Sequence, residues 1–131
     1  MTTQPPRDST PVDVTGTQTV TETYVGKCWW LNGVYHREDG PAVEQFDGSK
    51  FWILHGEFHR VDGPALEHSH GDREWYVHGI RHRTDGPAVM RSGAEVEWWL
   101  DGWLCSSAID YCAGLGLTPE ETTLFLLKWS S

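Results

Sequence analysis

The sequence HREDGPA at residues 36–42 returns as HRVDGPA at residues 59–65 and again as HRTDGPA at residues 82–88. The copies begin at positions 36, 59 and 82, so both steps are 23 residues long. A fixed period of about 20–50 residues is typical of proteins built from stacked supersecondary units. The chain is therefore expected to be a repeat protein, with its remaining residues interpreted in the frame of this period.

The same period aligns apolar residues upstream of each motif. One column is Trp29, Trp52, Trp75 and Trp98; the next is Trp30, Ile53, Tyr76 and Trp99; the third is Leu31, Leu54, Val77 and Leu100. Because successive residues of a strand point to opposite faces, the first and third columns share one face and the middle column lies on the other. Both faces of the predicted sheet are therefore apolar at this level.

A short turn sequence follows each set of columns. The turns are Asn32-Gly33, His55-Gly56, His78-Gly79 and Asp101-Gly102. Asn-Gly and Asp-Gly favour the two positive φ values of a type I′ turn, which predicts the tip of a tight hairpin. In the motif that follows, glycine can adopt conformations barred to other residues and proline stops ladder pairing. The pattern predicts a mainly β fold, an antiparallel β-meander of 23-residue hairpin repeats over residues 16–104.

The two ends of the chain differ from this array. Residues 1–15 are rich in Thr, Pro, Ser and Gln, which indicates an extended or disordered arm, and the β-branched residues 17–25 predict an edge strand. From residue 105 the pattern becomes helical. Ser106 or Ser107 can cap a short helix, and residues 118–121, TPEE, form a capping box with proline at the first helical position. Residues 105–131 are therefore predicted to form a C-terminal helical cap on a face or the open end of the sheet.

The composition narrows the classes of partner and location. The chain has 131 residues, which is the length of a single domain. Its formal net charge is −9, and because an acidic surface repels phosphates, the chain is not expected to bind nucleic acid. Three cysteines are too few for a disulfide framework, which indicates either a reducing compartment or indifference to redox conditions. With no apolar run of about 18 residues and no signal peptide, the expected location is the cytoplasm of a host cell or a virion.

Two segments resemble the repeats of a known family. WLNGVYH at residues 30–36 resembles the aromatic residue, turn glycine and following histidine of MORN repeats, and DGSKFW at residues 47–52 resembles their linking turn and next strand. The likeness covers about residues 28–104. Arg-x-Asp-Gly-Pro-Ala stands where MORN repeats usually carry Gly-x-Gly, so the chain resembles the HRxDGPA-type variant of phage and bacterial proteins. The resemblance implies an elongated or curved array for protein contacts and scaffolding, with headgroup binding sometimes proposed, and no catalytic activity.

The histidines do not have the spacing of a metal site. If each repeat adds two strands, equivalent histidines lie about 9–10 Å apart, whereas bonds from nitrogen to zinc are only about 2.0–2.1 Å long. We instead expect a structural clamp in which the Asp carboxylate caps the Gly-Pro turn and the Arg pairs with it or with the adjacent repeat. The clamp residues are His36, His59, His82, Asp39, Asp62 and Asp85. His68 and His70 have a weak metal-like spacing and are interpreted as solvated loop residues, so no metal or cofactor is expected.

No enzyme is expected from this sequence. Cys105 or Cys112 can be drawn beside a histidine, and Ser106 beside a histidine and an aspartate. No local nucleophile motif supports these combinations, and Cys112 falls on the apolar side of a predicted helix, where a buried structural thiol is the ordinary case.

The aromatic columns are the leading candidate for a binding surface. Trp30, Tyr76 and Trp99, with Tyr35 and Phe58 on the paired strands, can form an exposed stripe unless the helices or the arm cover it. The leading hypothesis is a non-catalytic binding or assembly protein encoded by a phage, either a virion component or an inhibitor of a host protein, acting through a protein partner or self-association. The alternative is a sponge for a nucleotide-like small molecule, or a headgroup-binding module, with phosphate contacts from Arg37, Arg60 and Arg83. Each of these arginines, however, lies two residues from an aspartate.

Overall fold

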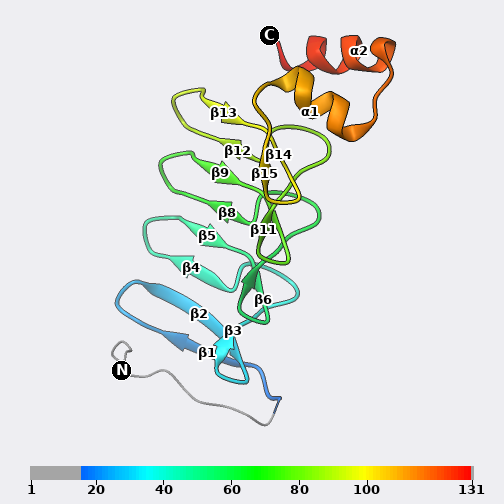
Figure 1. Ribbon diagram of the computed structural model, residues 1–131. Coiled ribbons are helices and arrows are strands. Elements are labelled where there is room, and N and C mark those ends of the chain that lie inside the picture. The colour runs from blue at the N-terminus through cyan, green and yellow to red at the C-terminus, as the bar shows by residue number, and fades with distance from the viewer. Residues whose placement is uncertain (1–15, 131) are drawn as a thin grey trace.

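The computed structural model describes residues 16–130, which form a mainly β structure with two helices at its C-terminal end (Figure 1). The largest sheet has nine strands, ordered β1-β2-β4-β5-β8-β9-β12-β13, with β3 paired to β2 off this path. Three further sheets have two strands each, and every strand pair is antiparallel. The meander-like antiparallel sheet is thus present, while the predicted arm at residues 1–15 lies outside the described residues.

The strands are short and follow one another in a regular order. The main sheet contains β1 (Thr19–Glu22), β2 (Gly26–Leu31), β3 (Val34–Tyr35), β4 (Val43–Gln45), β5 (Lys50–Phe51), β8 (Leu66–Glu67), β9 (Arg73–Glu74), β12 (Val89–Met90) and β13 (Val96–Glu97). The side hairpins are β6 (Ile53–Leu54) with β7 (Glu57–Phe58), β10 (Tyr76–Val77) with β11 (Ile80–Arg81), and β14 (Trp99–Leu100) with β15 (Trp103–Leu104).

Strand register advances in step with the sequence period. Within successive units the paired residues are Val43 with Phe51, Leu66 with Glu74, and Val89 with Glu97; between units they are Phe51 with Leu66 and Glu74 with Val89. Each 23-residue segment therefore adds two strands to the main sheet. Since neighbouring strands are about 4.8 Å apart, equivalent positions in adjacent units are about 10 Å apart.

The expected single meander is divided where the second, third and fourth units pass their first-column tryptophans, whereas β2 runs unbroken through Trp29 in the first unit. β5 ends at Phe51 and β6 begins at Ile53, so Trp52 separates a strand of the main sheet from a side hairpin. Its N–H donates to the carbonyl of Ala65 in the next unit, and its carbonyl accepts from the N–H of His59 in its own unit. The backbone of Trp52 is thereby bonded to two different segments, and the chain leaves the main sheet at this residue.

The β2–β3 hairpin and the side hairpins have the predicted turn conformation at their tips. Asn32 and Gly33 have φ values of 52° and 81°, and His55 and Gly56 have values of 49° and 81°. Each later tip also hydrogen-bonds to the preceding hairpin, as when the N–H of Gly56 donates to the carbonyl of Tyr35. The hairpins therefore stack on one another along the axis of the array.

The two faces of the main sheet differ in chemistry. One face carries a row of opposite charges across six neighbouring strands, formed by Glu22, Lys27, Glu44, Lys50, Glu67 and Arg73. Opposite charges across a strand pair stabilise it by roughly 0.2–1 kcal/mol. On the other face the core gathers Cys28, Trp30, Val43 and Ile53 with Phe51 and Phe58. Lys27 and Trp29 are two residues apart on β2, so the charged row lies on the same face as the first-column tryptophans.

Two helices close the C-terminal end of the array (Figure 1). Helix α1 spans Ala108–Leu115, with Ser107 as its N-cap and Gly116 at a φ of 79° as its C-cap. Helix α2 spans Pro119–Trp129, and the predicted capping box is present between Thr118 and Glu121. Within residues 16–130 neither helix is long and apolar enough to cross a membrane. The helices lie over the open end of the array rather than over a face of the sheet.

One turn of the main sheet contains a strained alanine. Ala94 has a φ of 77°, whereas glycine occupies the equivalent positions, with φ values of 98° at Gly48 and 109° at Gly71. We expect Ala94→Gly to raise the free energy of unfolding by about 0.5 kcal/mol, because relief of left-handed strain outweighs the added entropy of the unfolded chain. Gly48→Ala, whose added Cβ meets only ordinary contacts, should lower it by about 1 kcal/mol. Equal urea midpoints for the wild type and both variants would contradict this explanation.

Candidate binding site

The arginine of each HRxDGPA motif stacks on the first-column tryptophan of its own unit. The distances from arginine Cζ to the centre of the indole are 3.8 Å for Arg37 on Trp29, 3.7 Å for Arg60 on Trp52 and 3.9 Å for Arg83 on Trp75. Cations at this distance over an indole face are held by its quadrupole. The three distances agree within 0.2 Å, so the same arrangement occurs three times.

Hydrogen bonds fix the guanidinium group in the plane of this stack. Arg60 Nε donates to Asp62 Oδ1 at 3.1 Å, and its Nη1 donates to the carbonyl of Pro64 at 3.0 Å and to Glu67 Oε2 at 3.2 Å. Arg37 makes the same set of contacts, and Arg83 differs in facing the sulfur of Met90. The loop is therefore held by the arginine, which bonds the proline carbonyl, and the aspartate side chain accepts from the arginine.

The motif glycine is needed for space. An ideal Cβ at Gly63 would lie 2.8 Å from Arg60 Cζ, and one at Gly40 would lie 3.0 Å from Arg37 Cζ. The positive φ values are found elsewhere, at the hairpin tips and sheet turns. The expectation that this glycine supplies an unusual backbone conformation is thus wrong. It allows the guanidinium to lie directly against the backbone.

The motif histidines join neighbouring units. His36 Nδ1 accepts from the N–H of His55 at 2.9 Å, and their ring centres are 4.3 Å apart. His59 holds the N–H of His78, and His82 holds the N–H of Asp101, in the same way. A ring nitrogen can accept such a bond only when it carries no proton. Each of the three bonds therefore requires the neutral form of its histidine.

Two equivalent hollows open between consecutive motif loops. Their volumes are about 550 and 540 Å³. The first is lined by Arg37, Glu38, Asp39, Gly40, Trp52, Leu54, His59, Arg60, Val61 and Asp62, and the second by Arg60, Val61, Asp62, Gly63, Trp75, Val77, His82, Arg83, Thr84 and Asp85. Each hollow thus lies between the arginine and glycine of one motif and the tryptophan of the next unit.

The rims of these hollows carry exposed carboxylates. The exposed fraction of the side chain is 82% for Glu38, 86% for Asp39, 81% for Asp62 and 78% for Asp85. The motif arginines beneath them are largely covered, at 22%, 21% and 15% for Arg37, Arg60 and Arg83. The outer edge of the hollows is therefore acidic, while the positive charges lie inside the stack.

The predicted aromatic stripe is largely covered by its own neighbours. Trp30 is buried, and its indole N–H donates to Thr21 Oγ1 at 2.8 Å while its ring packs against Tyr35. Tyr76 and Trp99 are half-buried and both lie against the guanidinium of Arg81. Phe58 packs between Phe51 and Tyr76. Only Tyr35 among the five is classed as exposed, at 37%.

Sequence reasoning missed the most exposed tryptophan of the array. Trp103 is 78% exposed and the adjacent Leu104 is 58% exposed, both on β15. Trp103 stands outside the three apolar columns, in the position occupied by Val34, Glu57 and Ile80 in earlier units. That column gives no consistent apolar signal, so only the structure shows the side chain on the surface.

The described residues do not assemble a metal site. Within residues 16–130 no group of three or more His, Cys, Asp or Glu side chains is placed to hold a metal ion. His70 Nε2 lies 3.2 Å from Asp72 Oδ2, and His68 Nε2 lies 3.5 Å from Glu74 Oε2, so these two histidines face separate carboxylates. Burial raises the pKa of the thiols of Cys28, Cys105 and Cys112, which favours their protonated form.

The arginine stack predicts a specific sensitivity to arginine geometry. Arg60→Lys keeps the charge but loses the planar fork that reaches Asp62, Pro64 and Glu67 while lying on Trp52. We expect the free energy of unfolding to fall by about 2 kcal/mol, the scale of hydrogen bonds to a charged group in a part-buried setting. The matched control is Arg73→Lys, an exposed member of the charged row, which should change it little. Urea titration of both variants measures the two free energies of unfolding, and an equal loss of stability in both would contradict the role of the stack.

The histidine bonds predict acid sensitivity. Burial and the nearby His78 lower the pKa of His59 below its ordinary value of 6.5. The unfolded chain therefore takes up this proton first, so the contribution of His59 to stability is present above about pH 6.5 and declines as the pH falls below it. His59→Asn cannot titrate and should flatten this part of the pH dependence. Urea midpoints at several pH values between 7.5 and 5 would test this; identical slopes for the two proteins would refute it.

Comparisons with protein-family models, curated proteins and solved structures found no match for this chain. Its function has therefore to be inferred from the arrangement of its own residues.

Proposed function

We propose that the protein is a non-catalytic binding or assembly protein that contacts other proteins through a MORN-like repeat array. The observation that carries this proposal is the position of its exposed apolar side chains. Most of the largest lie at the two ends of the array, where Tyr24 and Phe46 are 86% and 73% exposed and Trp103 and Leu127 are 78% and 63% exposed, while Val61, 84% exposed, lies between the ends. Exposed aromatic and aliphatic groups in one region are typical of protein interfaces.

At the N-terminal end two turns hold the apolar residues together. The N–H of Phe46 donates to the carbonyl of Val25 at 2.9 Å, which joins the turn after β4 to the turn between β1 and β2. Tyr24 and Val25 are both exposed beside it. This hydrogen bond brings the two turns together, so the exposed apolar residues at the N-terminal end come from adjoining segments.

At the C-terminal end the apolar residues come from three elements. Trp103 and Leu104 lie on β15, Ile109 lies on α1, and Leu124 and Leu127 lie on one side of α2. The opposite side of α2 packs toward the array, since the Phe125 and Trp129 rings contact Trp98. The exposed leucines are thus not needed to attach the helix to the array, which supports a contact with another molecule.

The MORN-like assignment is supported by the 23-residue period and by tight hairpins that recur with it. The likeness to HRxDGPA-type variants of phage and bacterial proteins extends the proposal to a phage-encoded component of a larger particle or an inhibitor of a host protein. The nucleotide sponge is the weaker candidate, because Arg37, Arg60 and Arg83 are engaged by carboxylates, proline carbonyls or the Met90 sulfur, and indole rings.

Native mass spectrometry of the untagged protein from its own host or an infected lysate tests this proposal. We expect integer multiples of the chain mass or a co-purifying protein, because the apolar ends would remain covered. Trp103→Ser with Leu127→Ser should reduce the associated fraction at least tenfold, whereas the exposed control Glu95→Ser should not. A bare monomer would contradict the proposal, and extra mass of a few hundred daltons would favour the small-molecule alternative.

A further inference from the structure

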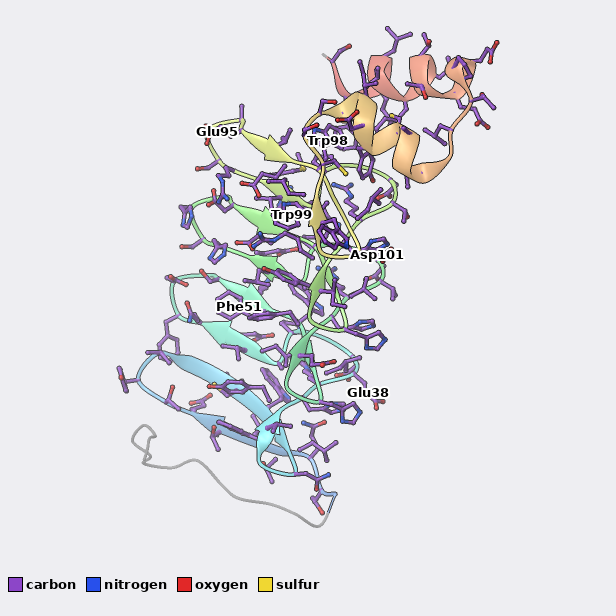
Figure 2. The ribbon with its side chains drawn as sticks, viewed as in Figure 1. Glu38, Phe51, Glu95, Trp98, Trp99 and Asp101 are labelled. Atoms are coloured by element: carbon purple, nitrogen blue, oxygen red, sulfur yellow. The ribbon has the colours of Figure 1, made fainter. Side chains whose placement is uncertain are left out.

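The position after the third motif, equivalent to the two hollows, is filled by the chain itself. Trp129 of α2 lies against Gly86 so closely that an ideal Cβ there would be 2.5 Å from the indole Cζ2. The centre of the same indole is 5.4 Å from Arg83 Cζ and 6.2 Å from the ring centre of Trp98. An aromatic ring thus occupies the space between the arginine of one unit and the tryptophan of the next. Figure 2 shows Trp98 at this end of the array, beside α1.

A tyrosine completes the filling of this third position. Tyr111 of α1 is fully buried, its ring centre lies 4.9 Å from that of Trp98, and its hydroxyl donates to the carbonyl of Arg83. The same hydroxyl accepts from the N–H of Gly86 at 3.3 Å. Burial raises the pKa of Tyr111 to about 12, which keeps the hydroxyl protonated as a donor. The motif loop therefore presents one carbonyl and one N–H that a phenol can bridge.

The two open hollows present the corresponding motif residues without a ring from the described part of this chain between them. They differ from the third position in one respect, because the next arginine, Arg60 or Arg83, also lines each hollow, whereas Ser106 replaces it at the third position. Arg37 and Gly40 take the places of Arg83 and Gly86 in the first hollow, and Arg60 and Gly63 take them in the second. Trp52 and Trp75 stand where Trp98 stands. Gly86 and Pro87 are buried under the helices, whereas the equivalent glycines and prolines in the first two motifs are half-buried.

We propose that the two hollows bind tyrosine or tryptophan side chains of a partner protein, in the manner in which the third position holds Tyr111 and Trp129. This inference rests on the proposed protein-binding function and names the chemistry of one contact. The ring would lie between the motif arginine and the next tryptophan, and a phenol or indole N–H would donate to the backbone carbonyl of Arg37 or Arg60, the equivalents of the Arg83 carbonyl. Val61, 84% exposed, borders both hollows and gives them a shared apolar rim.

The charge and spacing of the hollows define the partner segment further. The exposed carboxylates of Glu38, Asp39 and Asp62 favour lysine or arginine beside the aromatic residues and disfavour the phosphates of a nucleotide. The hollows repeat with the units, about 10 Å apart, which corresponds to three residues of a polyproline II segment, where residues i and i+3 lie on the same side, or to seven residues of a helix. The fitting segment is thus basic, with two aromatic side chains at such an interval.

A peptide titration followed by nuclear magnetic resonance tests this inference on the full chain. The probe is the acetylated, amidated peptide Trp-Lys-Lys-Trp, and its control is Ala-Lys-Lys-Ala with the same charge. We expect saturable shifts of the Gly40 and Gly63 amide signals with the first peptide, at least tenfold weaker effects with the second, and no saturable shift at Gly86, which Tyr111 already occupies. No saturable shift at Gly40 and Gly63, or an equal response to both peptides, would overturn the inference.

A rim variant separates this inference from the broader proposal. Val61→Lys places a cation between the two hollows at an exposed position, so folding should be unaffected and the probe should bind at least tenfold more weakly; Val61→Ile is the matched control. Unchanged binding to Val61→Lys would reject the hollows as the site. If wild type and Val61→Lys retained a protein partner equally, the hollows would be rejected as the site while the protein-binding function remained. If the chain bound neither another protein nor a second copy of itself, the protein-binding function itself would be contradicted.

Discussion

The stacking of an arginine between an indole and a glycine is the contact on which the array depends. Arg60 contacts four residues of its unit, because it lies on Trp52 and bonds the loop at Asp62 and Pro64 and the strand at Glu67. A lysine lacks the planar shape and a larger residue than glycine would occupy the same space. The motif therefore recurs in the chain as a set of mutually dependent residues, since each one holds the geometry that the others need.

Contacts between units use different atoms from contacts within a unit. The arginine closes each loop, while the histidine beside it reaches the hairpin tip of the next unit through Nδ1. At the fourth unit Cys105 and Ser106 stand where histidine and arginine would be, and aromatic residues of the helices cover Trp98 instead. The helical cap thus replaces the missing arginine by other groups that shield the last indole.

The sequence sufficed to predict the antiparallel strands, the turn conformation at Asn32-Gly33 and the helix cap at Thr118, because these depend on local backbone preferences; for the first helix it left Ser106 and Ser107 as alternative caps, and the cap is Ser107. It did not predict the division of the sheet at Trp52, which results from hydrogen bonds to Ala65 and His59 in separate segments. The hollows were also beyond reach from sequence, since they depend on how far apart successive loops stack. Burial of Trp30 beneath Thr21 and Tyr35 was missed for the same reason.

The charged row across the main sheet has a consequence for how the array can change in length. Glu and Lys or Arg alternate from Glu22 to Arg73, so a duplicated 23-residue segment would bring one basic and one acidic residue to the row in the same register. Such a duplication would lengthen the array by about 10 Å and add one further hollow, with little disturbance of its neighbours. The row ends at Met90 and Val96, which face each other without charge. Growth of the array by duplication is therefore compatible with its interior but not with its last unit.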